Sequence, residues 1–354
     1  MKKKKLTSII SVVAMCAVIL TSCGKSAESS SAAESSSSKA ETTTTTAPVE
    51  SSLAETTASS ADESSTAEGE SDITPAMWVV TAPNGNKMTM LGSMHALKDE
   101  CYPLPDEIMD AYNSADILAV ECDTTTISNE TQEKLLKQMT YTDDTTLKDH
   151  ISTEAYEALS TYVEDFGFNI SVFDAYQPWA VSNTIDSLLY SYADLDTTIG
   201  IDCYLMGLAH EENKEIYEVE SVDFQMDMLL GFSDDVYDLM FLEYEGETLK
   251  SQTETLNQMY DAWTIGNTEF IEEESYSTED EVAEYTEKQL AAYEDYTNQM
   301  LTDRNVGMAE AVKKLLNDGK NVFYVVGEAH FVGDTGIIAL LEQDGYTVER
   351  VEYN

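Results

Sequence analysis

Apolar residues in this chain follow one period near its two ends and another in its middle. Toward the ends they form short runs rich in β-branched and aromatic residues, or alternate with polar residues, as β-strands do. Through most of the middle they recur at the three- and four-residue spacing of helices buried on one side. The strand-like runs lie at 77–82, 87–91, 115–123, 215–220, 322–326 and 346–353, and the long helical stretches at about 128–209, 222–266 and 279–318.

This order of elements predicts the fold class. Strands cluster toward the two ends, so we expect an α/β fold of the mixed α+β kind, with a central mixed β-sheet built from both chain ends. Helices should cover this sheet. The middle of the chain should form a large helical insertion that carries the one short strand at 215–220.

Two of the predicted strands end in the same four-residue pattern, Gly-x-x-His. One is Gly92-Ser-Met-His95 and the other is Gly327-Glu-Ala-His330. A glycine lets the backbone turn sharply where a strand stops. Catalytic groups of α/β proteins commonly lie just beyond the carboxyl ends of strands. We therefore expect the imidazoles of His95 and His330 to meet at one edge of the sheet.

Three glutamates stand at comparable positions. Glu121 and Glu220 close two predicted strands, and Glu328 lies inside the second Gly-x-x-His pattern. Two imidazoles with carboxylates are a ligand set for a divalent metal such as Mn²⁺, Co²⁺ or Zn²⁺. Such a metal lowers the pKa of a bound water and polarises a carbonyl, which is hydrolytic chemistry. Two alternatives stay open: a histidine at a strand end is more often a hydrogen-bonded structural residue, and Glu121 can equally be a solvated strand terminus.

The first 22 residues have the pattern of an export signal. Four lysines at 2–5 precede the apolar run 9–20, which is too short to cross a membrane. The tetrapeptide Leu20-Thr-Ser-Cys23 resembles the lipobox of bacterial lipoproteins, which implies cleavage before Cys23 and a diacylglycerol on its thiol. Two acyl chains form a stable anchor. We expect a protein held on the outer face of the cell membrane by this lipid alone; the alternative is an ordinary secretory signal with a chance cysteine.

Composition changes sharply after this segment. Residues 23–74 are mostly Ser, Thr, Ala and Glu, so they have too little apolar surface to offset the entropy of ordering, and they predict a disordered tether. From 75 to 354 the composition becomes that of a single folded domain. We therefore divide the chain into a signal peptide at 1–22, a tether at 23–74 and a domain at 75–354.

Charge and cysteine content narrow the possible partners. The formal net charge is -48, and it becomes about -52 without the four signal lysines, from 15 Lys and Arg against 67 Asp and Glu. So acidic a protein should repel nucleic acid and anionic lipid head groups. Outside the signal and Cys23, the cysteines are Cys101, Cys122 and Cys203, which allow at most one disulfide and have no metal-pair spacing. The sequence favours no particular oligomeric state.

Several segments, in the same order along the chain, resemble the TraB/GumN family, which includes the TIKI proteases. They are 91–105, 114–123, Gln177-Pro-Trp-Ala180, Gly200-Ile-Asp202, Tyr217-Glu-Val-Glu-Ser221 with Gln225, Met259-Tyr-Asp-Ala-Trp263, Leu301-Thr-Asp-Arg-Asn305, Val325-Val-Gly-Glu-Ala-His330 and 345–350. The resemblance implies a fold related to the erythromycin-esterase and haem-binding ChaN proteins. For the TIKI branch it implies a metal-dependent peptidase that uses both histidines and a glutamate.

Carried onto this sequence, the resemblance places His95, His330 and Glu121 in the site and adds Glu220 and Arg304 as further polar positions. Arg304 could stabilise a developing oxyanion or clamp a substrate carboxylate; alternatively it forms a buried ion pair with a glutamate. Glu328 departs from the family pattern, since bacterial members often have a small residue there. It could be an extra metal ligand, a general base, or an acid at the rim.

Together these sequence features predict a lipid-anchored, extracytoplasmic, metal-dependent hydrolase of peptide bonds. In it His95 and His330 bind the metal, Glu121 is a ligand or the general base, and Arg304 with Glu220 completes the polar site. The alternative is a surface protein without catalytic activity that captures a peptide, haem or another small ligand in the same cleft. A shared fold does not decide between them.

Overall fold

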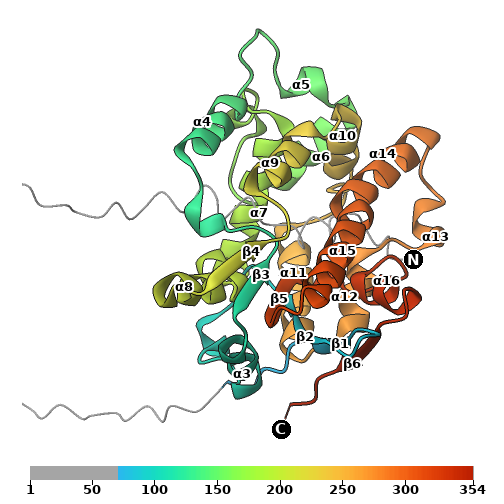
Figure 1. The fold of residues 1–354 in the computed structure, drawn as a ribbon. Helices are drawn as coiled ribbons and strands as arrows, with labels where there is room; N and C mark the ends of the chain where they lie inside the picture. Colours follow the sequence, from blue (N-terminus) through green and yellow to red (C-terminus); the bar gives the residue numbers. More distant parts are fainter. Residues whose placement is uncertain (1–70, 354) are drawn as a thin grey trace, which may run out of the picture. The chain divides into compact units, whose positions relative to one another are not determined.

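The structure is a computed structural model and describes residues 71–353 (Figure 1). The predicted signal peptide, Cys23 and residues 23–70 of the predicted tether lie outside the described residues. Residues 71–74 belong to the folded part, because Ile73 is buried and the N–H of Thr74 donates to the carbonyl of Thr264 at 2.6 Å.

A six-stranded mixed sheet forms the centre, with strand order β4-β3-β5-β2-β1-β6. The strands are β1 (Met77–Thr81), β2 (Lys87–Ser93), β3 (Ile117–Val120), β4 (Glu215–Glu218), β5 (Val322–Gly327) and β6 (Thr347–Arg350). β4, β3, β5 and β2 run parallel to one another, whereas β1 pairs antiparallel with both β2 and β6. The predicted mixed sheet is confirmed. β4, which comes from the middle of the chain, forms one edge, as Figure 1 shows.

Helices occupy the connections between strands. They are α3 (Asp106–Ser114), α4 (Asn129–Gln138), α5 (Leu147–His150), α6 (Thr153–Glu164), α7 (Pro178–Tyr192), α8 (Ile201–Glu212), α9 (Val222–Gly231), α10 (Asp234–Leu242), α11 (Leu249–Thr264), α12 (Thr268–Ser275), α13 (Glu279–Val282), α14 (Glu287–Thr297), α15 (Asp303–Asn317) and α16 (Ile337–Gln343). Most of them lie between β3 and β5, where the helical insertion is predicted. No helix among residues 71–353 combines the length and the apolar character that crossing a membrane requires.

The sheet is buried on both faces, which explains why β5 reads as an unbroken apolar run. Phe323 and Val325 belong to a core shared with the insertion helices, including α7, α8, α10 and α11. Tyr324 and Val326 belong to a second core shared with α15 and α16. Successive side chains of a strand point to opposite faces, so one strand contributes to both cores. β5 is thereby fixed in the middle of the sheet.

α15 begins after a π-helical turn, Asn298–Thr302. Such a turn leaves carbonyl groups without their usual helical donors, and it is frequent at functional sites. Here the Nη1 atom of Arg304 donates to the carbonyl of Met300 at 3.2 Å. The turn thus helps to fix a buried guanidinium that points toward the end of the parallel strands.

Candidate functional site

Four predicted site residues lie just beyond the carboxyl ends of the four parallel strands. Glu220 follows β4, Glu121 follows β3, His330 follows β5 and His95 follows β2. Gly327, the last residue of β5, lies among them. A Cβ atom placed on it would be 3.1 Å from Glu121 Oε1, 3.5 Å from His330 Cδ2 and 3.7 Å from His95 Nε2. The two histidines and Glu121 therefore gather at the same point, as expected from their positions in the sequence.

The two imidazoles are held in the same way. His95 Nδ1 lies 2.6 Å from Asp202 Oδ2, and His330 Nδ1 lies 2.6 Å from Asn305 Oδ1. Both partners are oxygen acceptors, so both Nδ1 atoms carry hydrogen and donate it. The Nε2 atoms then face the cluster, and that of His330 is 3.6 Å from Glu121 Oε1. Histidines that bind metals are commonly oriented by such a hydrogen bond from the other ring nitrogen.

The surroundings give the two imidazoles opposite charge states. Burial lowers the pKa of His95, but the hydrogen-bonded Asp202 carboxylate and Glu121 outweigh it and raise the pKa to about 9. Burial and the Arg304 guanidinium lower the pKa of His330 to about 3, and Glu121 opposes them only in part. At neutral pH the site therefore holds one imidazolium and one neutral imidazole.

Glu121 is the centre of a buried hydrogen-bond network. Its Oε1 accepts the N–H of Gly327 at 2.8 Å, and its Oε2 accepts Arg304 Nη2 at 2.5 Å and Gln225 Nε2 at 3.2 Å. Burial alone would raise the pKa of Glu121, but Arg304, His330 and His95 hold it well below its usual range. A carboxylate with so low a pKa is a weak base. This favours Glu121 as a metal ligand and ion-pair partner over Glu121 as the general base.

Arg304 is held by two carboxylates and by the Met300 carbonyl. It is buried, its Nε donates to Glu220 Oε1 at 2.9 Å, and its Nη2 donates to Glu220 Oε2 at 2.8 Å as well as to Glu121. Gln225 closes this group, since its Nε2 also donates to Glu220 at 2.8 Å. Of the roles open to Arg304 from the sequence, the buried ion pair is the one that the structure shows. Glu220 acts on the cluster through Arg304.

Glu328 lines a small cavity together with His95 but joins none of the hydrogen bonds of the site. Its Cγ atom packs against Gly92, and neither of its carboxylate oxygens has a hydrogen-bond partner within residues 71–353. Burial raises the pKa of Glu328 to about 8, against a weaker opposing effect of Arg350. The structure shows no ion pair between Glu328 and His95 or His330 among the described residues.

Both glycines of the Gly-x-x-His patterns are explained by close contacts rather than by a turn. Neither Gly92 nor Gly327 has a positive φ, and Gly327 has φ -51° and ψ 137°, which other residues adopt readily. A Cβ on Gly92 would lie 2.8 Å from Glu328 Cγ, and one on Gly327 would approach Glu121 Oε1. β5 does end at Gly327, as predicted, and β2 ends one residue after Gly92, but neither turn requires the conformational freedom of glycine. The two glycines leave room for the stem or the oxygen of a glutamate from a neighbouring strand.

The site has donor atoms suited to a divalent cation but lacks a ready arrangement of three ligands among the described residues. In the part of the chain that the structure describes, no three His, Cys, Asp or Glu side chains are arranged so that they could hold a metal ion. The donor chemistry does fit, because two imidazoles with committed Nδ1 atoms face one ionised carboxylate. His95, His330 and Glu121 are the residues that would hold the metal.

Three residues that complete this network have no role assigned from the sequence: Asp202, Asn305 and Gln225. Each lies in a segment that resembles the family, but pattern and spacing do not connect them to the histidines. The other two histidines each contact an aspartate outside the site: His150 Nδ1 lies 3.1 Å from Asp234, and His210 Nε2 lies 2.7 Å from Asp123. Cys101, Cys122 and Cys203 are free thiols.

A cleft of about 820 Å³ opens beside the Arg304–Glu220 pair. Ser221, Phe224 and Met228 from α9 and its N-terminal cap line it together with that pair. This volume is within the range of sites for small organic molecules and short peptides. A ligand can therefore approach the polar network from the side of β4.

Comparisons with known proteins give a family match and partial matches to individual relatives. A model of the TraB/PrgY/gumN family matches residues 76–350. The uncharacterized protein YbaP of Escherichia coli (strain K12) is 26% identical over 155 residues, which cover 44% of this chain and 56% of YbaP. A Nematostella vectensis protein named metalloprotease TIKI homolog is 29% identical over 170 residues, 43% of this chain and 36% of that protein.

In both cases the match spans about half of the relative's own length or less. No solved structure matches the chain. The family model, in contrast, runs from the residue before β1 to the last residue of β6, and it includes both Gly-x-x-His patterns and the four parallel strand ends. On that evidence the chain belongs to the TraB/PrgY/gumN family.

Proposed function

We propose that this protein is a metal-dependent hydrolase of peptide bonds, held on the outer face of the cell membrane by a lipid on Cys23. The observation that carries the proposal is the convergence of two imidazoles on Glu121, each with its Nδ1 fixed by an oxygen acceptor. The name of the Nematostella relative, a metalloprotease TIKI homolog, supports the reaction class.

Each residue has a definite task in this proposal. His95, His330 and Glu121 bind the cation, which is Mn²⁺, Co²⁺ or Zn²⁺, and the bound cation supplies an activated water and polarises the substrate carbonyl. Asp202 and Asn305 fix the two rings with Nε2 toward the cluster. Arg304 keeps Glu121 ionised and Glu220 keeps Arg304 in place. His95 must release its proton for Nε2 to act as a ligand, so metal binding should release about one proton.

The test uses the mature protein and a random peptide pool. Chelation should abolish cleavage, and adding back Mn²⁺, Co²⁺ or Zn²⁺ should restore it. His95→Ala and His330→Ala should lose bound metal, measured by elemental analysis after dialysis. His150→Ala is the matched control and should keep its metal, because His150 is hydrogen-bonded to Asp234 in the helical insertion and not to the site. Full metal content together with hydrolysis in the His95→Ala/His330→Ala double variant would overturn the proposal.

The lipid anchor has a separate test. Cys23→Ser should move the protein from the membrane fraction to the soluble exported fraction without changing its folded domain. Retention in the membrane fraction would contradict the anchoring part of the proposal and leave the hydrolase part standing.

The second candidate is capture of a peptide, haem or another small ligand without catalysis. One observation favours it: Arg304 is taken up by Glu121 and Glu220, so it is not free to stabilise an oxyanion. An absorbance band on adding haem, with no metal-dependent cleavage of the peptide pool, is the result expected from this candidate.

A further inference from the structure

His95 and Glu328 both line a small cavity. Its volume is about 30 Å³, and most of its wall is apolar, with Met259, Trp263 and Ile271 among the lining residues. A single water needs roughly 10–15 Å³ of such space. The cavity can therefore hold about two waters or one group the size of an ammonium.

Two polar side chains in the cavity wall have no partner. Glu328 is 3% exposed and Ser93 is 4% exposed, and neither carboxylate oxygen of Glu328 nor Oγ of Ser93 has a hydrogen-bond partner within residues 71–353. Ser93 pairs with Gly327 in the parallel register of β2 and β5, so Ser93 and Glu328 belong to adjacent strand ends. Burying a carboxylate without a donor is costly. The cavity thus contains three polar oxygens whose hydrogen-bonding capacity is unused within residues 71–353.

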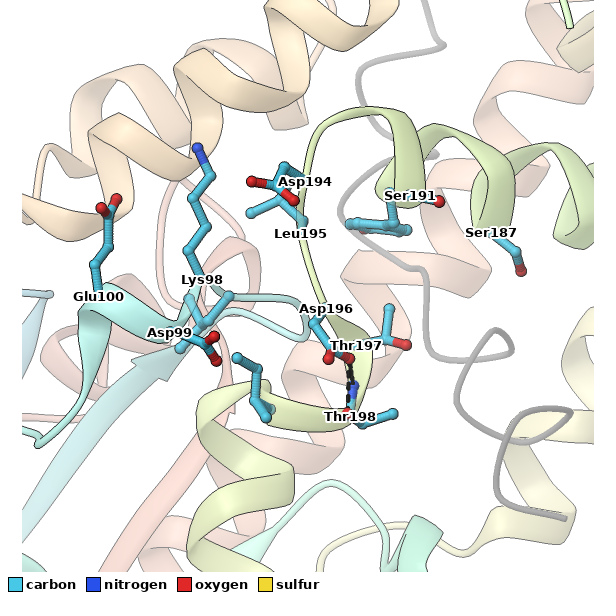
Figure 2. A pocket seen from close by; sticks show the side chains of 13 residues that line it. Lys98, Asp99, Glu100, Ser187, Ser191, Asp194, Leu195, Asp196, Thr197 and Thr198 are labelled. Carbon is cyan, nitrogen blue, oxygen red and sulfur yellow. Dashed lines mark hydrogen bonds between the residues drawn. The ribbon is translucent and has the colours of Figure 1, made fainter. Parts of the chain in front are cut away.

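An open acidic pocket shares one lining residue with this cavity. Tyr190 lines both the cavity and a pocket of about 690 Å³, which Figure 2 shows. Asp99, Asp194 and Asp196 line this pocket. Lys98 lines it as well. Its Nζ donates a hydrogen bond to Asn257 Oδ1 at 3.1 Å and lies 4.5 Å from the centre of the Tyr260 ring. A pocket walled by carboxylates concentrates cations near its mouth.

We propose that Glu328 and Ser93 form a subsite for a primary ammonium group of the substrate, either a peptide amino terminus or a lysine side chain. The three hydrogens of such a group match the two oxygens of an ionised Glu328 and the hydroxyl oxygen of Ser93, none of which has a partner within residues 71–353. His95 lines the same cavity, so the subsite adjoins the site at which the proposed hydrolysis occurs. This inference rests on the proposed function for its biological meaning, but binding of the ammonium is a property of the cavity alone.

The first experiment measures binding without hydrolysis. Methylammonium chloride is titrated into the metal-free mature protein by calorimetry, with methanol as the neutral ligand of similar size. Methylammonium should bind to the wild type, and methanol should not. Glu328→Gln should weaken methylammonium binding at least about tenfold, because a charge-assisted hydrogen bond is lost. Ser93→Ala should weaken it less, and Glu342→Gln, the same change on an exposed residue, should leave it unchanged.

The second experiment identifies the source of the ammonium. Peptides with free and acetylated amino termini, and peptides with lysine or norleucine, are compared as substrates of the wild type and of Glu328→Gln. Selectivity for the free amino terminus, or for lysine, should be present in the wild type and lost in the variant. Equal methylammonium binding in wild type and Glu328→Gln would mean that the cavity is a water site only and would overturn the inference. If Glu328→Gln fails to fold, Ser93→Ala decides, since unchanged binding there also overturns it.

The two proposals can fail separately. Methylammonium binding that depends on Glu328, with no peptide cleavage under any metal condition, would support the ammonium subsite and refute the proposed hydrolase activity. Metal-dependent cleavage with no preference for an ammonium group would support the hydrolase activity and refute the ammonium subsite.

Discussion

The buried carboxyl of Glu328 should make the stability of the ligand-free protein depend on pH in a specific way. Burial raises its pKa from an ordinary value of 4.5 to about 8 in the folded state. Between these two values the folded protein keeps a proton that the unfolded chain has lost. Stability should therefore fall as pH rises through this window and level off above about pH 8. Each unit of pKa difference corresponds to about 1.4 kcal/mol, which gives a loss of about 5 kcal/mol across the window.

Glu328→Gln isolates this effect, because it keeps the shape of the side chain and removes the titration. The variant should match the wild type within about 1 kcal/mol near pH 5 and exceed it by up to about 5 kcal/mol near pH 9. A loss of that size is comparable to the whole stability of many domains. The wild type should therefore become much easier to unfold at alkaline pH.

Urea unfolding of both proteins at a series of pH values, in a chelating sodium buffer, measures the difference. The chelator keeps metal binding at His95 and His330 out of the comparison. Glu342→Gln is the control and should run parallel to the wild type, since Glu342 is exposed. A constant gap between wild type and Glu328→Gln from about pH 5 to pH 9 would refute the reasoning, because it would show that Glu328 titrates alike in both states.

The remaining predictions concern the network around the histidines. Asp202→Asn removes the charge that holds the pKa of His95 near 9, so the pKa should fall below its ordinary 6.5 and metal affinity should drop about 10–100-fold; an unchanged His95 titration by NMR contradicts this. Gly92→Ala places a methyl group 2.8 Å from a packed side chain and should cost about 1–3 kcal/mol in thermal unfolding. Gly307→Ala meets no atom within 4 Å and should be neutral or stabilising, and equal effects of the two substitutions would count against the packing argument. Arg304→Met strands two buried carboxylates and should cost about 3–5 kcal/mol by the same measurement, with a near-neutral result showing that water compensates them.

The sheet and its insertion could be predicted from the sequence because each strand carries its own periodic signal. The meeting of His95 and His330 could be expected from the shared Gly-x-x-His pattern, but the pattern alone does not make β2 and β5 neighbours. That adjacency depends on cores assembled from helices far away in the chain. Asp202 lies 107 residues from His95, and Asn305 lies 25 residues from His330. No local signal links an imidazole to an acceptor at such distances.

The position of Glu328 shows a different limit of sequence reasoning. In the sequence it lies two residues before His330, which makes it a natural candidate for the same metal. The structure turns 328–330 into a 3₁₀ helix, in which successive side chains point about 120° apart. Residues two apart then point in different directions. Glu328 faces the cavity beside Gly92, whereas His330 faces Glu121.

Gly92 and Gly327 connect these observations. Each glycine lacks a side chain at the point where a glutamate that follows the neighbouring parallel strand packs: Glu328 packs over Gly92, and Glu121 packs beside Gly327. Because β2, β5 and β3 are adjacent and parallel, the two contacts repeat the same arrangement one strand apart. Glu121 forms an ion pair with Arg304 beside the histidines. Glu328 faces a cavity in which its carboxylate oxygens have no hydrogen-bond partner within residues 71–353. In this chain each glycine of the two Gly-x-x-His patterns therefore leaves room for a carboxylate, and the environment beyond the strand ends decides which carboxylate joins the proposed metal site.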